Sequence, residues 1–263
     1  MKYLRVSLLA AAMVAGVVLP VRSLGLGLAL EVAPAKLELA IPPGTTYNMP
    51  ITVHNSSTDS THVQATMVDF TVTRGGDYDF QRVGARNNSL LKWASINPRE
   101  FDINANTTQQ ERLSFEIPHD SQLSGEYAGI VFFQTRPMRH AGGVAFSERI
   151  ATKIYMTVPG TVKIDGVVAK MSSLEGSGGQ LYRVLFKNTG NAHVYLNGTL
   201  TVQHDGQAVQ QIAMPGEMLV ERGGERLVEL TGNRLSPGRY NALAVIDYGG
   251  KSMTGGQVSF DVH

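Results

Sequence analysis

Cysteine is absent from the 263-residue chain. Its absence excludes disulfide bonds, thiolate zinc sites and cysteine nucleophiles. An excess of charge is absent too, because 23 Lys and Arg residues balance 22 Asp and Glu residues to a formal net charge of +1. No strong electrostatic field therefore favours a nucleic acid or an anionic membrane surface as a partner.

Motifs of the common enzyme classes are also missing. The seven histidines lie at positions 54, 62, 119, 140, 193, 204 and 263, and none pairs at the HExxH spacing of zinc proteases. The sequence contains no GxSxG nucleophile elbow and no P-loop. We therefore predict that the protein is not an enzyme and expect no catalytic residue, metal or cofactor. A carboxylate dyad assembled in space is the alternative that the sequence leaves open.

The N-terminus has the pattern of a secretory signal peptide. Lys2 and Arg5 form a basic region, Leu8 to Leu19 form a short apolar core, and Pro20 ends it. This core is too short to span a bilayer, and no later apolar run is long enough. We expect residues 1–29 to be cleaved and the protein to be exported without membrane insertion. The alternative is a buried N-terminal helix.

The remaining sequence alternates apolar and polar residues in short segments, and turn signals separate these segments roughly every ten residues. Two pairs of segments repeat: ITVHNSSTDSTHVQATM resembles VLFKNTGNAHVYLNGTL, and LSGEYAGIVFF resembles LSPGRYNALAVID. A tyrosine at such a corner suits a β-sandwich, and Tyr127 and Tyr240 are the candidates. The predicted fold is all-β, with two tandem immunoglobulin-like β-sandwich domains at residues 30–160 and 161–263.

One stretch, GGVAFSERIATKIYMTVPG at residues 142–160, predicts a long β-strand at the boundary between the domains. Successive residues of a strand point to opposite faces. Val144, Phe146 and Ile150 would share one face, whereas Lys153 and Tyr155 would lie on the other. We predict that this strand is the working edge of the protein.

The chain resembles the PapD-like periplasmic chaperones of chaperone–usher pilus assembly. VIDYGG at residues 245–250 is similar to the Asp-Tyr-Gly segment late in that family's second domain, and FKNTGNAHVY at residues 186–195 is similar to its Asn-rich turn. In the first domain, FDINANTTQQERLSFEIP followed by GEYAGIVFF looks like its strand–turn–strand pair. ATKIYMTVPG looks like the end of its long seventh strand. The resemblance extends over most of the predicted mature chain.

The resemblance implies donor-strand complementation in the periplasm. In that mechanism the chaperone lends an edge strand to a pilus or fimbrial subunit that lacks the last strand of its own sandwich. Val144, Phe146 and Ile150 would enter the subunit's apolar groove. The alternative is that these three side chains face the core of their own domain. The implied partners are pilin-like subunits and an outer-membrane usher, and a self-capping dimer is a further expectation.

The resemblance also implies a basic pair that holds the subunit's C-terminal carboxylate. Lys36 occupies the place of the first basic residue, which is usually arginine in the family. The place of the second falls on or next to Tyr155, and Lys153 lies two residues earlier on the same face. Asp247 matches an acidic residue of the interdomain contact. The alternatives are that the two lysines are ordinary solvated charges on their strands and that Asp247 is a turn residue.

A second function is compatible with the same pattern. Tandem immunoglobulin-like domains followed by a Val-Pro-Gly-Thr-like linker also resemble the cell-surface WxL-interacting family. That resemblance implies an exported surface or cell-wall binding protein without chaperone activity. The membrane anchor that usually ends members of that family is not found here, so we rank this function second.

Overall fold

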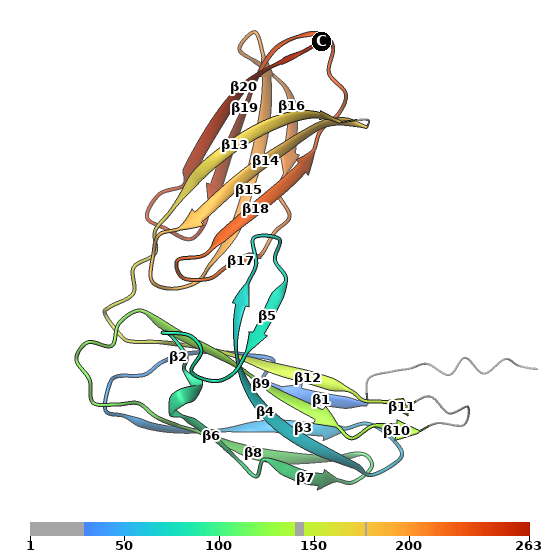
Figure 1. Cartoon of the computed structure of the whole chain (residues 1–263), viewed down its shortest axis with the longest axis vertical. Coiled ribbons are helices and arrows are strands. Elements are labelled where there is room, and N and C mark those ends of the chain that lie inside the picture. Colours follow the sequence, from blue (N-terminus) through green and yellow to red (C-terminus); the bar gives the residue numbers. More distant parts are fainter. Residues whose placement is uncertain (1–28, 140–144, 177) are drawn as a thin grey trace, which may run out of the picture.

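The computed structural model describes residues 29–139, 145–176 and 178–263. These residues form β-strands and one 3₁₀ turn, η1 (Leu91–Trp93), and contain no α-helix. The strands form two sandwich-like halves, which lie below and above the connection after β12 in Figure 1. The predicted all-β class is therefore confirmed. Most of the predicted signal peptide, residues 1–28, lies outside the described residues.

The first sandwich contains two main sheets and a small ribbon. One sheet has the strand order β1-β3-β8-β6, and the other has the order β2-β12-β9-β4-β5 with β7 beside β4. The ribbon consists of β10 and β11. The strand bounds are β1 (Leu30–Ala33), β2 (Lys36–Ala40), β3 (Thr46–Asn55), β4 (Thr61–Val72), β5 (Tyr78–Gln81), β6 (Ala94–Asn97), β7 (Glu100–Ile103), β8 (Thr107–Glu116), β9 (Glu126–Thr135), β10 (Met138–Arg139), β11 (Ala145–Phe146) and β12 (Arg149–Thr157).

The second sandwich contains a sheet of order β13-β14-β18 and a sheet of order β16-β15-β19-β20, with β17 beside β15. Its strand bounds are β13 (Gly166–Gly176), β14 (Gly179–Asn188), β15 (Val194–His204), β16 (Gln207–Ala213), β17 (Met218–Val220), β18 (Glu225–Thr231), β19 (Gly238–Asp247) and β20 (Thr254–Val262).

The degree of alternation in a strand matches its place in a sheet. β9, the most continuously apolar strand, lies between β12 and β4 and is buried along most of its length. β19 alternates buried and exposed residues because one of its faces packs on the second core while the other faces solvent. Each sandwich has its own apolar core, and the first has an additional apolar cluster on the outer face of the β12 sheet.

The repeated Asn turns found in the sequence have the same structure in both sandwiches. The Asn55 side-chain amide donates to the carbonyl of Asp59 at 2.8 Å, and that of Asn188 donates to the carbonyl of Ala192 at 2.8 Å. Both asparagines are buried. A buried amide needs such partners, because an unsatisfied polar group is costly to desolvate. The repeat therefore preserves a polar contact inside each sandwich.

The two predicted corner tyrosines differ in their contacts. The Tyr240 hydroxyl donates to the Ser236 carbonyl at 2.9 Å, four residues upstream, as the sequence predicts for a sandwich corner. Tyr127 is also buried, and its ring packs on Trp93 with the ring centres 4.9 Å apart. Tyr240 is thus anchored by its hydroxyl, while the described contact of Tyr127 is made by its ring.

The prediction of one unbroken strand over residues 142–160 is wrong at Ser147 and Glu148, which separate β11 from β12. Local polar bonds replace regular strand geometry there. The Ser147 hydroxyl donates to the Thr135 carbonyl at 2.7 Å, and the Glu148 amide donates to the Thr135 hydroxyl at 2.9 Å. The Glu148 carboxylate accepts hydrogen bonds from the amides of Ala29 and Leu30.

Glu111 is an acidic residue inside the first core. It lies on β8, on the same face as Leu113 and Phe115, and is 0% exposed. Neither carboxylate oxygen accepts a well-formed hydrogen bond from the described residues. Burial raises the pKa of Glu111, and the nearby Gln109 side chain offsets this effect only in part. The ionised carboxylate therefore opposes folding.

We expect Glu111→Gln to stabilise the protein at neutral pH. A raised pKa in the folded state means that wild-type stability is greatest below the unfolded pKa of about 4.3 and falls as pH rises through the folded pKa. The advantage of the variant should therefore grow as pH rises and then level off, reaching about 1–3 kcal/mol. Urea unfolding at a series of pH values measures this difference.

Glu116→Gln is the matched control, because Glu116 is exposed on the same strand. An advantage of Glu111→Gln that stays constant across the pH series, or that the control shares, would contradict a buried ionised carboxylate at position 111.

Candidate functional site

The predicted working strand lies between two neighbours that pair with it over different lengths. β12 pairs antiparallel with β9 along its whole length, from Arg149 to Thr157. On its other side it pairs in parallel with β2 only from Lys153 onward. The upstream part of β12, Arg149 to Thr152, is therefore an edge with respect to strand pairing.

Backbone hydrogen bonds along β12 alternate in direction. The Lys153 amide points away from β9 and donates to the Ala35 carbonyl at 2.9 Å. In an antiparallel pair, residues of the same parity direct their backbone groups to the same side. Arg149 and Ala151 therefore present N–H and C=O groups to the outer edge, upstream of the ladder with β2.

Even-numbered residues of β12 face the core of the first sandwich. Ile154 and Met156 are fully buried there, and Ile150 is partly buried and packs against the same core. The structure thus places Ile150 in contact with its own sandwich, which is the alternative left open by the sequence.

Odd-numbered residues of β12 lie on the opposite face of the sheet, which we call the interdomain face. Tyr155 packs there in an apolar cluster with Phe70, Ile130 and Phe132. The Arg149 guanidinium lies 3.5 Å from the centre of the Phe132 ring, at cation–π distance. Aromatic rings and a cation therefore occupy this face next to the outer edge of β12.

Lys36 and Lys153 lie side by side. Their Cα atoms are register partners in the parallel pair of β2 and β12, so their side chains share one face. The Lys36 ammonium lies 5.3 Å from the centre of the Tyr195 ring, and that of Lys153 lies 5.6 Å from the centre of the Tyr78 ring. The structure thus brings together the two lysines that the resemblance selects.

Both lysines already have local partners. The Lys36 ammonium lies 2.7 Å from a carboxylate oxygen of Glu38, and their hydrogen bond lowers the pKa of Glu38 and raises that of Lys36. The side chains of Lys36 and Glu38 are both about half exposed. An ion pair this exposed is weak, so another carboxylate can replace Glu38. The Lys153 ammonium donates to the Tyr78 hydroxyl at 3.3 Å.

Tyr155 does not present its hydroxyl at the surface. Its side chain is buried, its oxygen has no hydrogen-bond partner among the described residues, and burial raises its pKa. Its ring packs on His193 of the second sandwich, with the ring centres 4.2 Å apart. Tyr155 therefore lies inside the contact between the two sandwiches, two residues beyond Lys153 on the same face of β12.

Phe146 lies in β11, where its Cα pairs with that of Met138. Its side chain is 43% exposed. Of the three predicted groove-inserting residues, Phe146 is therefore exposed and Ile150 is partly buried, whereas Val144 lies outside the described residues.

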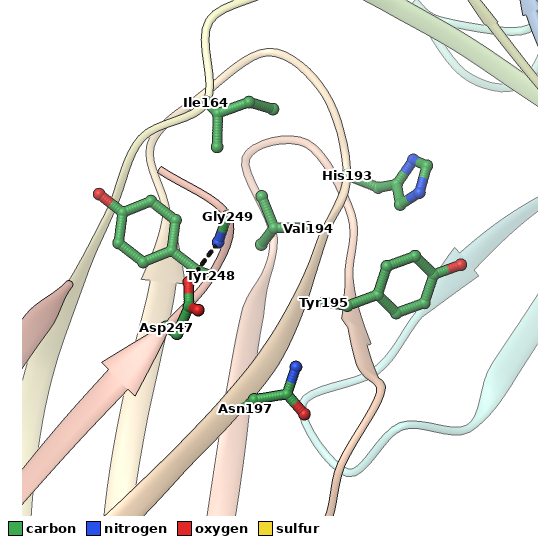
Figure 2. Close-up of a pocket in the computed structure, with 8 residues that line it drawn as sticks. All are labelled: Ile164, His193, Val194, Tyr195, Asn197, Asp247, Tyr248 and Gly249. Atoms are coloured by element: carbon green, nitrogen blue, oxygen red, sulfur yellow. Dashed lines mark hydrogen bonds between the residues drawn. The ribbon is translucent and has the colours of Figure 1, made fainter. Parts of the chain in front are cut away.

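Asp247 lies at the end of β19 and accepts a hydrogen bond from the Gly249 amide at 2.9 Å, which is the turn role left open by the sequence. It lines a cavity of about 340 Å³ that Figure 2 shows, together with Ile164 of the connection between the sandwiches. In that view the rings of His193 and Tyr195 point away from Asp247, toward strands of the first sandwich.

Sequence reasoning missed the main buried pair between the sandwiches, which joins Glu126 to His193. The His193 ring Nδ1 donates to a Glu126 carboxylate oxygen at 2.5 Å, and the His193 amide donates to the other oxygen at 3.2 Å. The Glu126 side chain is 4% exposed and that of His193 is 11% exposed. His193 lies in the Asn-rich turn noted in the sequence, but the carboxylate that it meets is 67 residues away.

Around this pair a pocket of about 230 Å³ opens between the sandwiches, and Glu38 and Thr157 also line it. Among the described residues no group of three His, Asp or Glu side chains is placed to hold a metal ion. Within the same part of the chain, no helix has the length and apolar character needed to cross a bilayer.

Sequence comparisons find no match, either to a protein-family model or to a curated relative. Comparison with solved structures does find matches. The structure titled "Crystal Structure of Class 5 Fimbriae Chaperone CfaA" matches with a TM-score of 0.50 and 9% identity, over 89% of this chain and 99% of that chain. A chain of a structure titled for a "chaperone-tip adhesin complex" of CFA/I fimbriae matches with a TM-score of 0.50 and 11% identity, over 84% of this chain and 95% of that chain. The protein therefore has the two-sandwich fold of these fimbrial chaperone structures.

Proposed function

We propose that the protein is a periplasmic chaperone that binds pilin-like subunits and completes their open β-sheet with its own edge strand. The observation that most supports this proposal is the outward direction of the Arg149 and Ala151 backbone groups, upstream of the point where β2 starts to pair. An unpaired edge of this kind recruits a further strand through main-chain hydrogen bonds.

The ribbon of β10 and β11 extends the same edge. Phe146 is exposed there, and an exposed aromatic ring supplies the apolar area that a groove in a partner would bury. Val144 and Ile150 complete the proposed groove-inserting set. Ile150 would have to divide its contacts between its own core and the partner, so Phe146 is the principal anchor in this proposal.

Lys36 and Lys153 are the proposed anchor for the C-terminal carboxylate of the subunit. Two ammonium groups on one face form the charge-assisted hydrogen bonds that such a group needs when it leaves water. In the free protein the Lys36 ammonium pairs with the Glu38 carboxylate. The C-terminal carboxylate of the subunit would take the place of Glu38 in this ion pair. Tyr155, the third residue of the proposed anchor, would act through its ring, which packs on His193 next to the pair.

The proposed setting is the periplasm, after removal of the signal peptide predicted at residues 1–29. The proposed domains are residues 30–160 and 161–263, with Asp247 on the side of the second domain that faces their connection. An outer-membrane usher would receive the captured subunits. A dimer that pairs two β12 edges would protect the same backbone groups when no subunit is present.

We expect Ala151→Pro to reduce subunit capture while the sandwich stays folded. Proline removes the outward N–H of residue 151 but no hydrogen bond to β9, and edge strands tolerate it for this reason. Loss of one ladder bond of about 1 kcal/mol weakens binding roughly fivefold. The measurement is the amount of subunit that the tagged protein retains from a periplasmic extract.

Ala151→Ser is the matched control, because it keeps the N–H and adds only a hydroxyl group to the side chain. Equal retention by the proline variant, the serine control and the wild type would refute the edge as the binding element. Thermal unfolding of each variant checks that the sandwich is intact.

We expect Lys36→Ala and Lys153→Ala each to weaken subunit retention by about tenfold or more, because each removes a charge-assisted contact worth about 1.5–3 kcal/mol. Lys170→Ala is the matched control, since Lys170 is exposed on β13 of the second sandwich. The same extract retention assay applies. If both lysine variants retained subunit as the control does, anchoring at this pair would be excluded.

A further inference from the structure

The hairpin of β4 and β5 reaches beyond its own sheet. Figure 1 shows it extending from the first sandwich to the lower end of the second. Its turn is the Arg74-Gly75-Gly76-Asp77 segment, closed by hydrogen bonds from the Thr73 amide to the Asp77 carbonyl at 2.9 Å and from the Gly76 amide to the Thr73 carbonyl at 3.0 Å. A hairpin that leaves its sheet needs another surface, because two strands alone are marginally stable in water.

The tip of the hairpin contacts β18. The Leu227 amide donates to the Arg74 carbonyl at 2.9 Å, and the Arg74 side chain forms an ion pair with Glu225. The Arg226 guanidinium lies so close to Gly76 that an added Cβ would stand 1.9 Å from Nη1. Gly76 also has a φ of +103°. Glycine at this position therefore permits the turn, and it leaves room for the Arg226 guanidinium beside it.

The hairpin and the loop after it are also joined to the second sandwich through Glu221. The Glu221 carboxylate accepts a hydrogen bond from the Val72 amide and lies 3.1 Å from the Arg86 guanidinium. The side chains of Arg86 and Glu221 are 22% and 12% exposed. Removing one partner of such a pair leaves a partly buried charge uncompensated, which is strongly unfavourable.

The connection between the sandwiches is a second, separate attachment. The Gly125 amide donates to the Thr161 hydroxyl at 2.8 Å, and the Asn191 side-chain amide donates to the Thr161 carbonyl at 2.9 Å. The Glu126 amide donates to the Asn191 carbonyl at 2.9 Å. These bonds hold the connection itself, whereas the hairpin makes its contacts at β18 and at Glu221. Two separated attachments prevent rotation about either one.

We propose that the β4–β5 hairpin is an interdomain brace that sets the orientation of the two sandwiches before any partner binds. It places Tyr78 of the first sandwich beside Lys153 and holds the second sandwich where Tyr195 covers Lys36. This inference does not depend on what the interdomain face binds, because every contact that supports it lies within this chain.

The absence of native cysteine makes a direct distance measurement possible. Gln110→Cys and Gln257→Cys place one spin label on each sandwich, at exposed positions. Pulsed electron spin resonance then gives the distribution of distances between the labels without any partner. The brace variant is Arg74→Ala with Glu221→Ala. The matched control is Arg183→Ala with Glu229→Ala, which removes an exposed ion pair of 2.7 Å inside the second sandwich.

We expect one narrow distance distribution in the wild-type background and in the control. In the brace variant the distribution should widen about twofold or more, because the second sandwich is then held mainly by the connection and the neighbouring Glu126–His193 contacts, and domains with a small interface move relative to one another. Circular dichroism checks that both sandwiches remain folded. If Glu221→Ala prevents folding, Arg74→Ala with Glu225→Gln tests the tip alone, with the same expected widening. A broad distribution in the wild type, or equal widths in brace variant and control, would overturn the proposal.

Discussion

The alternating direction of backbone hydrogen bonds along β12 is the constraint on which the structure of the site depends. Even-numbered residues bond to β9 and send their side chains into the first core, whereas odd-numbered residues bond outward and place their side chains on the interdomain face. The two-residue repeat of the strand therefore fixes its outer edge, its core face and its interdomain face together. A shift of one residue would exchange all three.

Patterns that depend on neighbouring residues were readable from the sequence. Alternation predicted the all-β class and the two faces of β12, and the resemblance selected Lys36 and Lys153, which the structure places in register. The Asn turns and Tyr240 also depend on contacts close in sequence, since their side chains bond within four residues of themselves. Local chemistry was therefore sufficient for the fold class and for part of the site.

Features that depend on distant contacts were not readable. The break at Ser147 and Glu148 depends on Thr135 and on the amides of residues 29 and 30. The burial of Tyr155 depends on His193, and the hairpin depends on residues about 150 positions later in the chain. Periodicity measures which face of a strand is apolar, but it contains no information on which other element covers that face.

The parallel pairing of β2 with β12 has a geometric consequence for any added strand. β2 occupies the outer edge from Lys153 onward, and Pro34 and Ala35 just before it bond to Thr152 and Lys153, so a strand that adds upstream meets this segment first. It has no ladder to follow past that point, where Lys36 and Lys153 stand. β2 thus limits the length of an added strand, because a segment that runs toward β2 must turn away or stop. A chain terminus satisfies this limit, and its carboxylate would then stop beside the only two cations in register on that pair of strands.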